Sequence, residues 1–337
     1  TPSREDGSID LSYLQAAAET VGRGMRSASG YQVITVKSTV IPGTTEDMVR
    51  PALEAASGKV AGRDFGLCMN PEFLLEGSAV QDALHPDRLV IGGLDKRSIR
   101  SLEGVYAKLD CPHFLTDLRT AEMVKYATNS FLATKVSFAN ELANLCDTLG
   151  GINVDRVVEG MALDPRINGR FLKAGLGFGG SCFPKDVKAI AAAGRTKGYS
   201  PRLLNAVLEL NDFQPTRAIE LAEKAIGSLK GKRVAILGLS FKGGSDDIRE
   251  SRAIPLAQAL LKRGAKVVGY DPKANEAFHR AVPKVEIADS VTTALNQADV
   301  CIVHNDWPEW RELTAEAFAG MRRKVVVDGR RIVPSSV

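Results

Sequence analysis

The sequence predicts an α/β protein with two Rossmann-like, doubly wound domains, joined by a long central helix and a small helical domain. Two observations carry this prediction. Apolar, β-rich runs alternate with helical segments at both ends of the chain, a pattern typical of parallel βαβ units. Between them, residues 120–149 keep helical periodicity without proline or glycine until Gly150. At 1.5 Å per residue this helix is about 45 Å long, and we expect it to link the domains.

The N-terminal part alternates between the two kinds of element. Its predicted elements are a helix over 11–28 with Asp10 as N-cap, a strand over 31–37, a helix over 44–57, and strands near 65–69 and 88–91. No strand followed by Gly-x-Gly-x-x-Gly occurs near the start of the chain. Either the chain binds no dinucleotide in the usual way, or its beginning is missing.

The strand–helix pattern restarts at Gly231 and predicts the second doubly wound domain. Its predicted elements are strands over 233–238, 266–271, 299–304 and 324–328 and a helix over 252–263, after shorter helices over 153–162 and 201–224. From these elements we expect three domains, over residues 1–117, 118–212 and 213–337.

Composition excludes several classes of partner. The net charge of the 337 residues is only +4 and is spread along the chain, which argues against nucleic acid but suits a ligand with phosphates. The five cysteines are scattered, without a Cys-x-x-Cys pair, so we expect reduced thiols in a cytoplasmic protein and no metal site. No apolar run has the length that would span a membrane, so we expect no membrane partner.

One glycine-rich turn predicts a nucleophile. Gly175-Leu-Gly-Phe-Gly-Gly-Ser-Cys182-Phe-Pro-Lys185-Asp186 places a cysteine before a proline that suits the first turn of a helix. The positive end of a helix favours the thiolate, which is the nucleophilic form of cysteine. A buried cysteine in a tight loop is the alternative, but the four nearby glycines would let a ligand approach the backbone. We therefore interpret Cys182 as a nucleophile.

Other polar residues lie where ligands bind in such folds. Lys125 and Asn129, at i and i+4, share a face of the long helix. Glu72 and Glu76 follow a strand, as Ser38 and Thr39 do, and the loop 241–249 follows the first strand of the second domain. Each of these, taken alone, is also compatible with a solvated surface.

Five motifs occur in order: Val36-Lys-Ser-Thr-Val-Ile-Pro-Gly, Asn70-Pro-Glu-Phe-Leu-Leu-Glu-Gly-Ser, Val124-Lys-Tyr-Ala-Thr-Asn, Gly177-Phe-Gly-Gly-Ser-Cys-Phe-Pro-Lys-Asp, and Phe241-Lys with Asp247-Ile-Arg-Glu-Ser. Together they resemble the UDP-glucose/GDP-mannose dehydrogenase family, from the first residue of the chain to its end. In that family Val-Gly-Thr-Pro follows roughly the first 80 residues, which carry the Gly-x-Gly-x-x-Gly turn. Because Thr1-Pro2 matches that point, we expect the chain to lack the first half of its NAD-binding domain and to be poorly active.

The resemblance implies a four-electron oxidation of the C6 alcohol of UDP-glucose to UDP-glucuronate, with two NAD⁺ and one water consumed. Lys125, or a water held by Asp186, would take the first proton. Cys182 would trap the aldehyde as a thiohemiacetal, which is then oxidised to a thioester. Glu72 would activate the hydrolytic water with Thr39 as a positioning partner, and Lys125 and Asn129 would stabilise the oxyanion.

The resemblance also implies the binding residues. Those near NAD would be Thr1, Pro2, Ser3, Ser38, Thr39, Glu76, Lys185 and Arg249. Those near the sugar nucleotide would be Glu72, Phe73, Leu74, Lys125, Asn129, Arg166, Phe171, Lys173, Gly175, Gly177, Phe178, Gly179, Phe241, Lys242 and Arg330. The chain would form at least a homodimer through the long helix.

Three alternatives stay open at this point. GDP-mannose or another nucleotide sugar could be the substrate, since Asn168 stands where UDP-glucose enzymes have glycine in the segment 166–173. The chain could be an inactive fragment that keeps only sugar-nucleotide binding and assembly. It could also be a hydroxyacid dehydrogenase of similar architecture, which would have no need of the Cys182 thiol.

Overall fold

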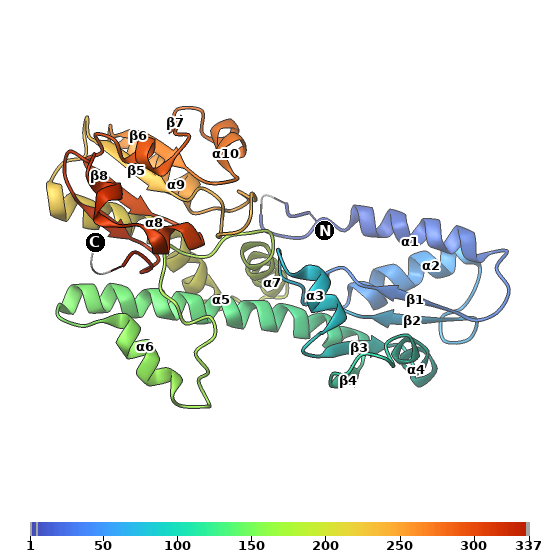
Figure 1. Cartoon of the computed structure of the whole chain (residues 1–337). Coiled ribbons are helices and arrows are strands. Elements are labelled where there is room, and N and C mark those ends of the chain that lie inside the picture. The colour runs from blue at the N-terminus through green and yellow to red at the C-terminus, as the bar shows by residue number, and fades with distance from the viewer. Residues whose placement is uncertain (1, 5, 335–337) are drawn as a thin grey trace. The chain divides into compact units, whose positions relative to one another are not determined.

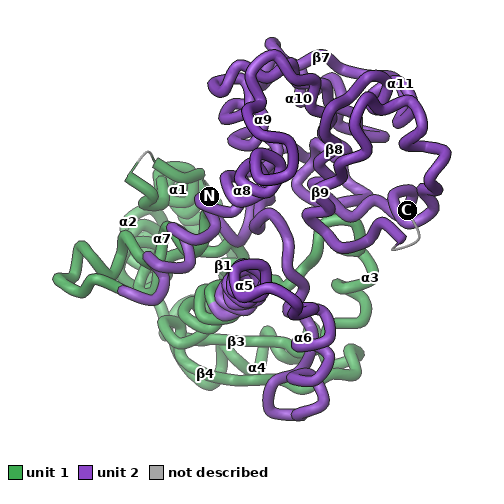
Figure 2. The backbone as a smooth tube through the Cα atoms, turned by 90° about the vertical axis from the view of Figure 1, so that its left-hand side faces the viewer, with its two compact units in different colours: residues 1–130, 185–201 green, residues 131–184, 202–337 purple. Residues whose placement is uncertain are grey.

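The computed structural model describes residues 2–4 and 6–334. The chain divides into two compact units, coloured green and purple in Figure 2. Unit 1 comprises residues 1–130 and 185–201, and unit 2 comprises residues 131–184 and 202–337. The sequence predicted three domains with boundaries after residues 117 and 212, and these boundaries differ from those of the two units. That three-domain division stays a prediction.

Unit 1 is a mixed four-stranded sheet with helices on both faces (Figure 1). Its elements are α1 (Ser12–Met25), β1 (Gln32–Val36), the π-helix η1 (Thr45–Val49), α2 (Arg50–Ser57), β2 (Phe65–Met69), α3 (Ala79–Leu84), β3 (Leu89–Gly93), α4 (Lys96–Val105) and β4 (His113–Thr116), followed by the first part of α5 (Leu118–Leu149) and most of α7 (Phe183–Thr196). The strand order is β1-β2-β3-β4.

Strand β2 explains why this sheet is covered on both sides. All five of its residues are buried. Phe65, Leu67 and Met69 pack in one cluster with Leu53 of α2, whereas Cys68 packs in another with Leu102 of α4. Alternate residues of a strand face opposite sides of the sheet, so a continuous apolar run requires a helix on each side.

One pairing in this sheet differs from expectation. β1 pairs with β2 and β3 pairs with β4 in parallel, but β2 and β3 are antiparallel, with Cys68 opposite Gly93. The predicted run of parallel βαβ units is therefore wrong between β2 and β3. A parallel crossover needs a helix that returns the chain along the sheet, and α3 has only six residues.

Unit 2 contains the second sheet, and its five strands are all parallel. Its elements are the rest of α5, then α6 (Val154–Ala162), α8 (Arg202–Ile226), β5 (Arg233–Leu237), α9 (Ala253–Lys262), β6 (Lys266–Tyr270), α10 (Asn275–Ala281), β7 (Glu286–Ile287), α11 (Val291–Leu295), β8 (Val300–Val303), the 3-10 helices η2 (Pro308–Glu312) and η3 (Ala315–Phe318), and β9 (Val326–Asp328). The order β7-β6-β5-β8-β9 confirms the predicted doubly wound unit.

The core of unit 2 lies on both faces of β5. Val234 and Ile236 pack in a cluster that includes Leu256 of α9, and Ala235 and Leu237 pack in a cluster with residues of α11, η2 and η3. The strand order reverses between β5 and β8, and ligands of open α/β sheets bind beside the carboxyl ends of such strands. The loop 238–251 and the residues after β8 begin at this edge.

Most helix boundaries follow their sequence signals. The long helix is confirmed as α5, and it ends at Leu149, before Gly150 with its φ of 76°. α1 begins one residue later than predicted and has Leu11, not Asp10, at its N-cap, although the Asp10 carboxylate accepts a hydrogen bond of 3.0 Å from the Ser12 N–H. Pro184 lies in the first turn of α7 as predicted. The short elements α3, α4, β4, α10, β7 and α11 were not predicted.

Candidate active site

The buried polar face of α5 is the centre of the site in unit 1. Lys125 is 4% exposed and Asn129 is 5% exposed, so the solvated-surface interpretation of this pair is wrong. The Lys125 ammonium donates a hydrogen bond of 2.6 Å to the Glu72 main-chain carbonyl and lies 3.2 Å from its carboxylate oxygen Oε1. Buried charges require such partners. Lys125 therefore binds both the backbone and the side chain of Glu72.

Asn129 is joined to the first turn of α7 by Asp186. The Asn129 carboxamide Nδ2 donates a hydrogen bond of 2.6 Å to Asp186 Oδ2, and the Lys185 ammonium pairs with Asp186 Oδ1. Asp186 is 1% exposed. Each of its oxygens has a donor, so the carboxylate is held in one orientation and fixes the carboxamide of Asn129 in turn.

Phe73 follows Glu72 and is covered by two cations. The Arg88 guanidinium carbon lies 4.2 Å from the centre of the Phe73 ring, and the Lys125 ammonium lies 5.2 Å from it. Glu72, Phe73 and the exposed Leu74 line a cavity of about 230 Å³ within unit 1. The loop after β2 is thus anchored by α5 and open to a ligand.

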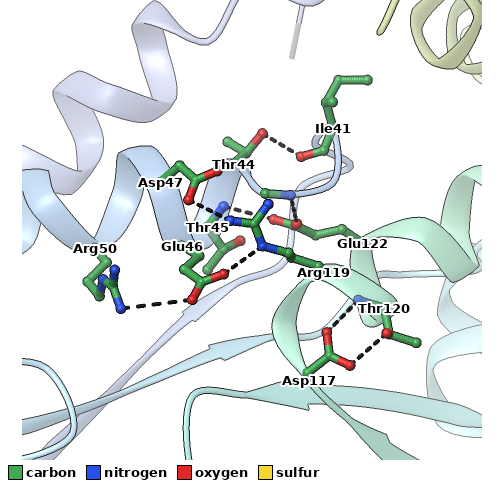
Figure 3. A network of polar contacts seen from close by, with 11 residues as sticks. Ile41, Thr44, Thr45, Glu46, Asp47, Arg50, Asp117, Arg119, Thr120 and Glu122 are labelled. Atoms are coloured by element: carbon green, nitrogen blue, oxygen red, sulfur yellow. Dashed lines mark hydrogen bonds and ion pairs between the residues drawn. The ribbon is translucent and has the colours of Figure 1, made fainter. Parts of the chain in front are cut away.

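The loop after β1 is bound to α5 by a buried carboxylate (Figure 3). Glu122 accepts hydrogen bonds of 2.5 Å from the Gly43 N–H and 2.8 Å from the Thr45 N–H. Burial raises the pKa of Glu122, and its hydrogen bonds to Thr45 and Gly43 oppose this. Glu122 lies three residues before Lys125, so the loop that carries Ser38 and Thr39 is connected to the same helix.

The glycine-rich turn of unit 2 is bound through its backbone by three buried amide side chains. The Gly175 N–H donates to Asn140 Oδ1 at 2.7 Å, and the Gly175 carbonyl accepts from Gln214 Nε2 at 2.9 Å. Asn211 accepts from the Phe178 N–H at 2.7 Å and donates to the Phe178 carbonyl at 3.1 Å. These bonds satisfy the polar backbone of a buried loop.

The glycines of this turn have a packing role that sequence reasoning missed. Gly177 has a φ of 102° and Gly180 a φ of 81°, values that side-chain-bearing residues rarely adopt. A Cβ on Gly180 would also lie 2.7 Å from the ring of Phe241. The glycines at these positions are therefore required by the protein's own fold, beyond any approach to a ligand.

Cys182 differs in its exposure from every other cysteine of the chain, all five of which lie in the described part. Cys68, Cys146 and Cys301 are buried, Cys111 is half-buried, and Cys182 is exposed. Burial raises the pKa of Cys68 to about 12 and also raises that of Cys301, so neither ionises readily. Cys182 immediately precedes α7, and its sulfur lies 3.7 Å from the Ser181 hydroxyl oxygen. The buried-cysteine alternative is wrong.

The remaining predicted substrate residues in unit 2 are of two kinds. Arg166 and Lys173 are exposed, and Arg166 pairs with Asp164 at 2.6 Å. The others contact the glycine-rich turn or its neighbours: Gly179 and Phe178 lie within the turn, the Phe171 ring centre lies 6.0 Å from that of Phe183, and the Lys242 ammonium lies 5.5 Å from the ring of Phe241. The Arg330 Nε donates to the His304 carbonyl at 3.1 Å, and a Cβ on Gly175 would lie 2.8 Å from its Nη1.

The predicted cofactor residues are more dispersed. Thr1 lies outside the described residues. Pro2, Ser3, Ser38 and Glu76 are exposed, Thr39 is half-buried, and Lys185 is paired with Asp186 as described above. Arg249 is bound to Asp247, with its Nη2 2.6 Å from Asp247 Oδ2. Ser38 and Thr39 follow β1 at the carboxyl edge of the parallel pair β1–β2.

Within unit 1 the structure forms two groups of contacts that share α5: Lys125 contacts Glu72 and Phe73, and Asn129 contacts Asp186, which pairs with Lys185. Within unit 2 it brings the glycine-rich turn together with Phe241 and Arg330. Glu122, Asn140, Asn211 and Gln214 were missed. The signal that could have found them is a polar residue at an apolar position of a helix, where burial forces it to bind backbone groups.

No cluster of three or more potential metal ligands occurs among residues 2–4 and 6–334. In that same part of the chain, no helix combines the length and apolarity needed to cross a membrane.

Comparison with known proteins gives matches along the chain. Models of the UDP-glucose/GDP-mannose dehydrogenase family match in three parts: its NAD binding domain over residues 1–110, its central domain over 119–213 and its UDP binding domain over 235–335. The chain is 49% identical to the UDP-glucose 6-dehydrogenase AglM of Haloferax volcanii, over 99% of this chain and 78% of that protein. It is 39% identical to the UDP-glucose 6-dehydrogenase TuaD of Bacillus subtilis, over 98% of this chain and 71% of that one.

A solved structure supports the same relationship. The UDP-glucose dehydrogenase of Pyrobaculum islandicum superposes with a TM-score of 0.91 at 44% identity, covering 98% of this chain and 75% of that one. The fold is thus the mixed α/β, Rossmann-type fold of these dehydrogenases.

These matches correct one expectation. We predicted a chain that lacks the first half of its NAD-binding domain, and with it an incomplete N-terminal Rossmann half. That prediction is wrong, because the NAD binding domain matches residues 1–110 and the Haloferax volcanii relative aligns over 99% of the chain. The expected poor activity and the alternative of an inactive fragment stay predictions.

Proposed function

Because the chain belongs to the UDP-glucose/GDP-mannose dehydrogenase family, we propose that it oxidises the C6 alcohol of UDP-glucose to the carboxylate of UDP-glucuronate. The observation that carries the proposal is the buried network on α5, in which Lys125 binds Glu72 and Asn129 binds Asp186. Such a network supplies a cation, an amide donor and a carboxylate, the groups that a two-step oxidation of an alcohol needs.

NAD is the cofactor, as the match of the NAD binding domain to residues 1–110 indicates. When bound, it accepts a hydride in each of the two oxidation steps. The residues after β1 and β2 fit this group by their chemistry: the hydroxyls of Ser38 and Thr39 and the carboxylate of Glu76 can bind ribose hydroxyls and an amide. Arg249 and Lys185 would complete the set with cations.

Cys182 is proposed to carry the intermediate. Its thiolate attacks the C6 aldehyde and forms the oxyanion of a thiohemiacetal, and loss of a hydride from that carbon re-forms the C=O bond and leaves a thioester. The exposed position of Cys182 before the first turn of α7 supports this role, because both access and helix-terminal charge favour thiolate chemistry.

Lys125 and Asn129 are proposed to stabilise the negative oxygen that develops at C6. Lys125 contributes a charge, and the Asn129 amide contributes a donor whose orientation Asp186 fixes. Either Lys125 or a water held by Asp186 would accept the proton of the alcohol in the first step. Both alternatives place a base on the same network.

Glu72 is proposed as the base that activates water for thioester hydrolysis, with Thr39 as a positioning partner. The carboxylate takes a proton from water, the water oxygen attacks the thioester carbon, and the C–S bond breaks to release the carboxylic acid and the Cys182 thiolate. Glu72 suits this step because its side chain lines a cavity while Lys125 holds its backbone.

The sugar nucleotide is proposed to bind the glycine-rich turn of unit 2, through the backbone of 175–179 and the side chains of Phe241, Lys242 and Arg330. Three cations, Arg166, Lys173 and Lys242, provide charges that suit a diphosphate. The backbone of Phe171 has a φ of 65°, and the Phe171 ring lies beside that of Phe183.

We also propose that a second copy of the chain covers α5. Phe131, Phe138 and Leu145 are 65%, 47% and 48% exposed. Their spacing of seven residues places them on one stripe of the helix, and such stripes pair with other helices. We therefore propose that the chain forms at least a homodimer through α5.

The test is the stoichiometry of the reaction. Purified protein given UDP-glucose and NAD⁺ should form two NADH per sugar. Cys182→Ala should abolish formation of the second NADH. Cys111→Ala is the matched control, since Cys111 lies in unit 1, outside the residues proposed for the reaction, and should leave turnover unchanged. GDP-mannose and UDP-N-acetylmannosamine as competing substrates test the choice of sugar. One NADH per sugar, or full activity without the Cys182 thiol, would overturn the proposal.

A further inference from the structure

A second polar cluster lies beside the Glu72 loop and has no role in the reaction proposed above. Its centre is Asn70, which is fully buried and stands two residues before Glu72. Asn70 Oδ1 accepts hydrogen bonds from the Lys37 ammonium at 2.8 Å and from the Tyr106 hydroxyl at 2.7 Å. Its Nδ2 donates to the Val90 carbonyl at 2.8 Å. The carboxamide is therefore bound from three different elements of unit 1.

Asn70 joins the strand ends to the loop. Its N–H donates to the Val36 carbonyl at 2.9 Å, so its backbone continues the pairing of β1 with β2 past the end of the strand. Pro71 follows and restricts the backbone before Glu72. The side chain and the backbone of Asn70 together determine where the chain leaves the sheet.

Lys37 links this cluster to the carboxylate itself. Lys37 and Glu72 line the same cavity of about 230 Å³. Partial burial of the ammonium lowers the pKa of Lys37, and the Glu72 carboxylate opposes this, as expected of opposite charges that face each other. Lys125, 3.2 Å from Glu72 Oε1, is a further cation beside the same side chain. Glu72 is thus attracted both from the end of β1 and from α5.

We propose that Lys37 and Asn70 are positioning residues for Glu72: Asn70 fixes the backbone of the loop, and Lys37 binds Asn70 and orients the Glu72 carboxylate towards the hydrolytic water. The inference rests on the proposed function, in which Glu72 acts in hydrolysis and in neither hydride transfer. Without Lys37, the carboxylate loses one of its cationic neighbours, and the buried Asn70 Oδ1 loses a donor. Hydrolysis should then slow more than oxidation.

The experiment separates oxidation from hydrolysis in Lys37→Met. Rapid mixing with UDP-glucose and NAD⁺ should give a burst of two NADH per chain, at a rate within about threefold of wild type, and steady-state turnover should fall about 10- to 100-fold. Intact mass spectrometry of quenched samples should show the acyl group on Cys182. A purely structural defect would lower burst and steady state together, without this accumulation.

Three further variants keep the inference falsifiable. Lys37→Arg should restore turnover to within about threefold of wild type, because it keeps the charge. Tyr106→Phe removes one donor to Asn70 and should cause a smaller accumulation. Lys59→Met is the matched control, because its ammonium donates to the Ala28 carbonyl at 2.8 Å elsewhere in unit 1, and it should behave as wild type.

The outcomes distinguish the two proposals. Wild-type turnover in Lys37→Met, or equal loss of burst and steady state, would overturn the positioning role alone. A wild-type enzyme that forms one NADH per sugar and no acyl-Cys182 would overturn the proposed function, and the positioning role with it.

Discussion

The Asn129 carboxamide and the Asp186 carboxylate are joined by a hydrogen bond of 2.6 Å between α5 and α7. The two residues are 57 positions apart in the sequence, and both are buried. Because Asn129 Nδ2 donates to Asp186, the bond fixes the orientation of the carboxamide and thus the direction of its remaining hydrogen-bonding groups. An oxyanion needs a donor held in this way before the reaction begins.

Replacing Asp186 with asparagine tests this arrangement. Asp186→Asn keeps the shape but removes the charge that binds Lys185 and orients Asn129. We expect kcat to fall about 100-fold, the order of loss seen when one oxyanion donor is removed. Glu159→Gln is the control, since its ion pair with Arg156 lies on the surface. A kcat of Asp186→Asn within threefold of wild type, measured as NADH formation, would contradict this role.

Removal of the Glu122 carboxylate should destabilise unit 1. Glu122→Ala leaves the buried N–H groups of Gly43 and Thr45 without their acceptor, at a cost of about 2–4 kcal/mol in the free energy of unfolding. Glu46→Ala, which removes a surface partner of Arg119 in the same region (Figure 3), should cost less than about 1 kcal/mol. Urea denaturation of both variants measures the difference, and equal costs would refute the assignment.

His304 should make unit 2 sensitive to acid. Burial lowers the pKa of His304 to about 3, with the nearby Arg330 cation as a further cause. In the unfolded state the His304 imidazole binds a proton near pH 6.5, whereas in the folded state it stays neutral until about pH 3. The contribution of neutral His304 to the free energy of unfolding is therefore full above pH 6.5 and is lost as the pH falls towards 3. The slope within this window is about 1.4 kcal/mol per pH unit.

His304→Gln should remove that part of the pH dependence, and His279→Gln, at an exposed position of α10, should keep it. Free energies of unfolding measured between pH 7.5 and 5 decide the matter. The same slope in wild type and His304→Gln would show that another group is responsible.

Gly180 and Gly198 form a matched pair for the packing of the cysteine turn. Both have a φ of 81°, but only Gly180 would place a Cβ against Phe241, whereas Gly198 has open space. Gly198→Ala should cost about 1–2 kcal/mol from its backbone alone. Gly180→Ala should cost about 1–3 kcal/mol more, through overpacking, and should reduce activity. Thermal unfolding and NADH formation measure these effects; equal costs would exclude the packing role.

The apolar stripe of α5 predicts an oligomer. Phe138→Glu places a charge in the middle of the stripe formed by Phe131, Phe138 and Leu145 and should weaken self-association at least about tenfold. Glu141→Lys, on the same helix, is the control. Sedimentation velocity over a range of concentrations measures the assembly, and an unchanged dimer in Phe138→Glu would place the interface elsewhere.

The sequence by itself determined the longer elements and singled out Cys182 as the candidate nucleophile. Period-2 and helical patterns are local, so they located β2, β5, α5 and α8 within a few residues. The turn that leads to Cys182 could be predicted because glycine and proline have backbone conformations of their own. Lys125 and Asn129 could be placed on one face of α5, since a helix brings residues at i and i+4 together.

The tertiary structure decided what these residues bind. β3 runs antiparallel to β2, and this direction depends on how the 19-residue connection between them folds. The residues of that connection carry no periodic signal for the direction of the strand that follows. Asn140, Asn211 and Gln214 hold the turn of Cys182 through partners 33 to 39 positions away. Lys37 and Asn70 are 33 positions apart. Hydrogen bonds of this kind depend on distance in space, which a pattern along the chain does not contain, and burial then makes their polar groups require each other.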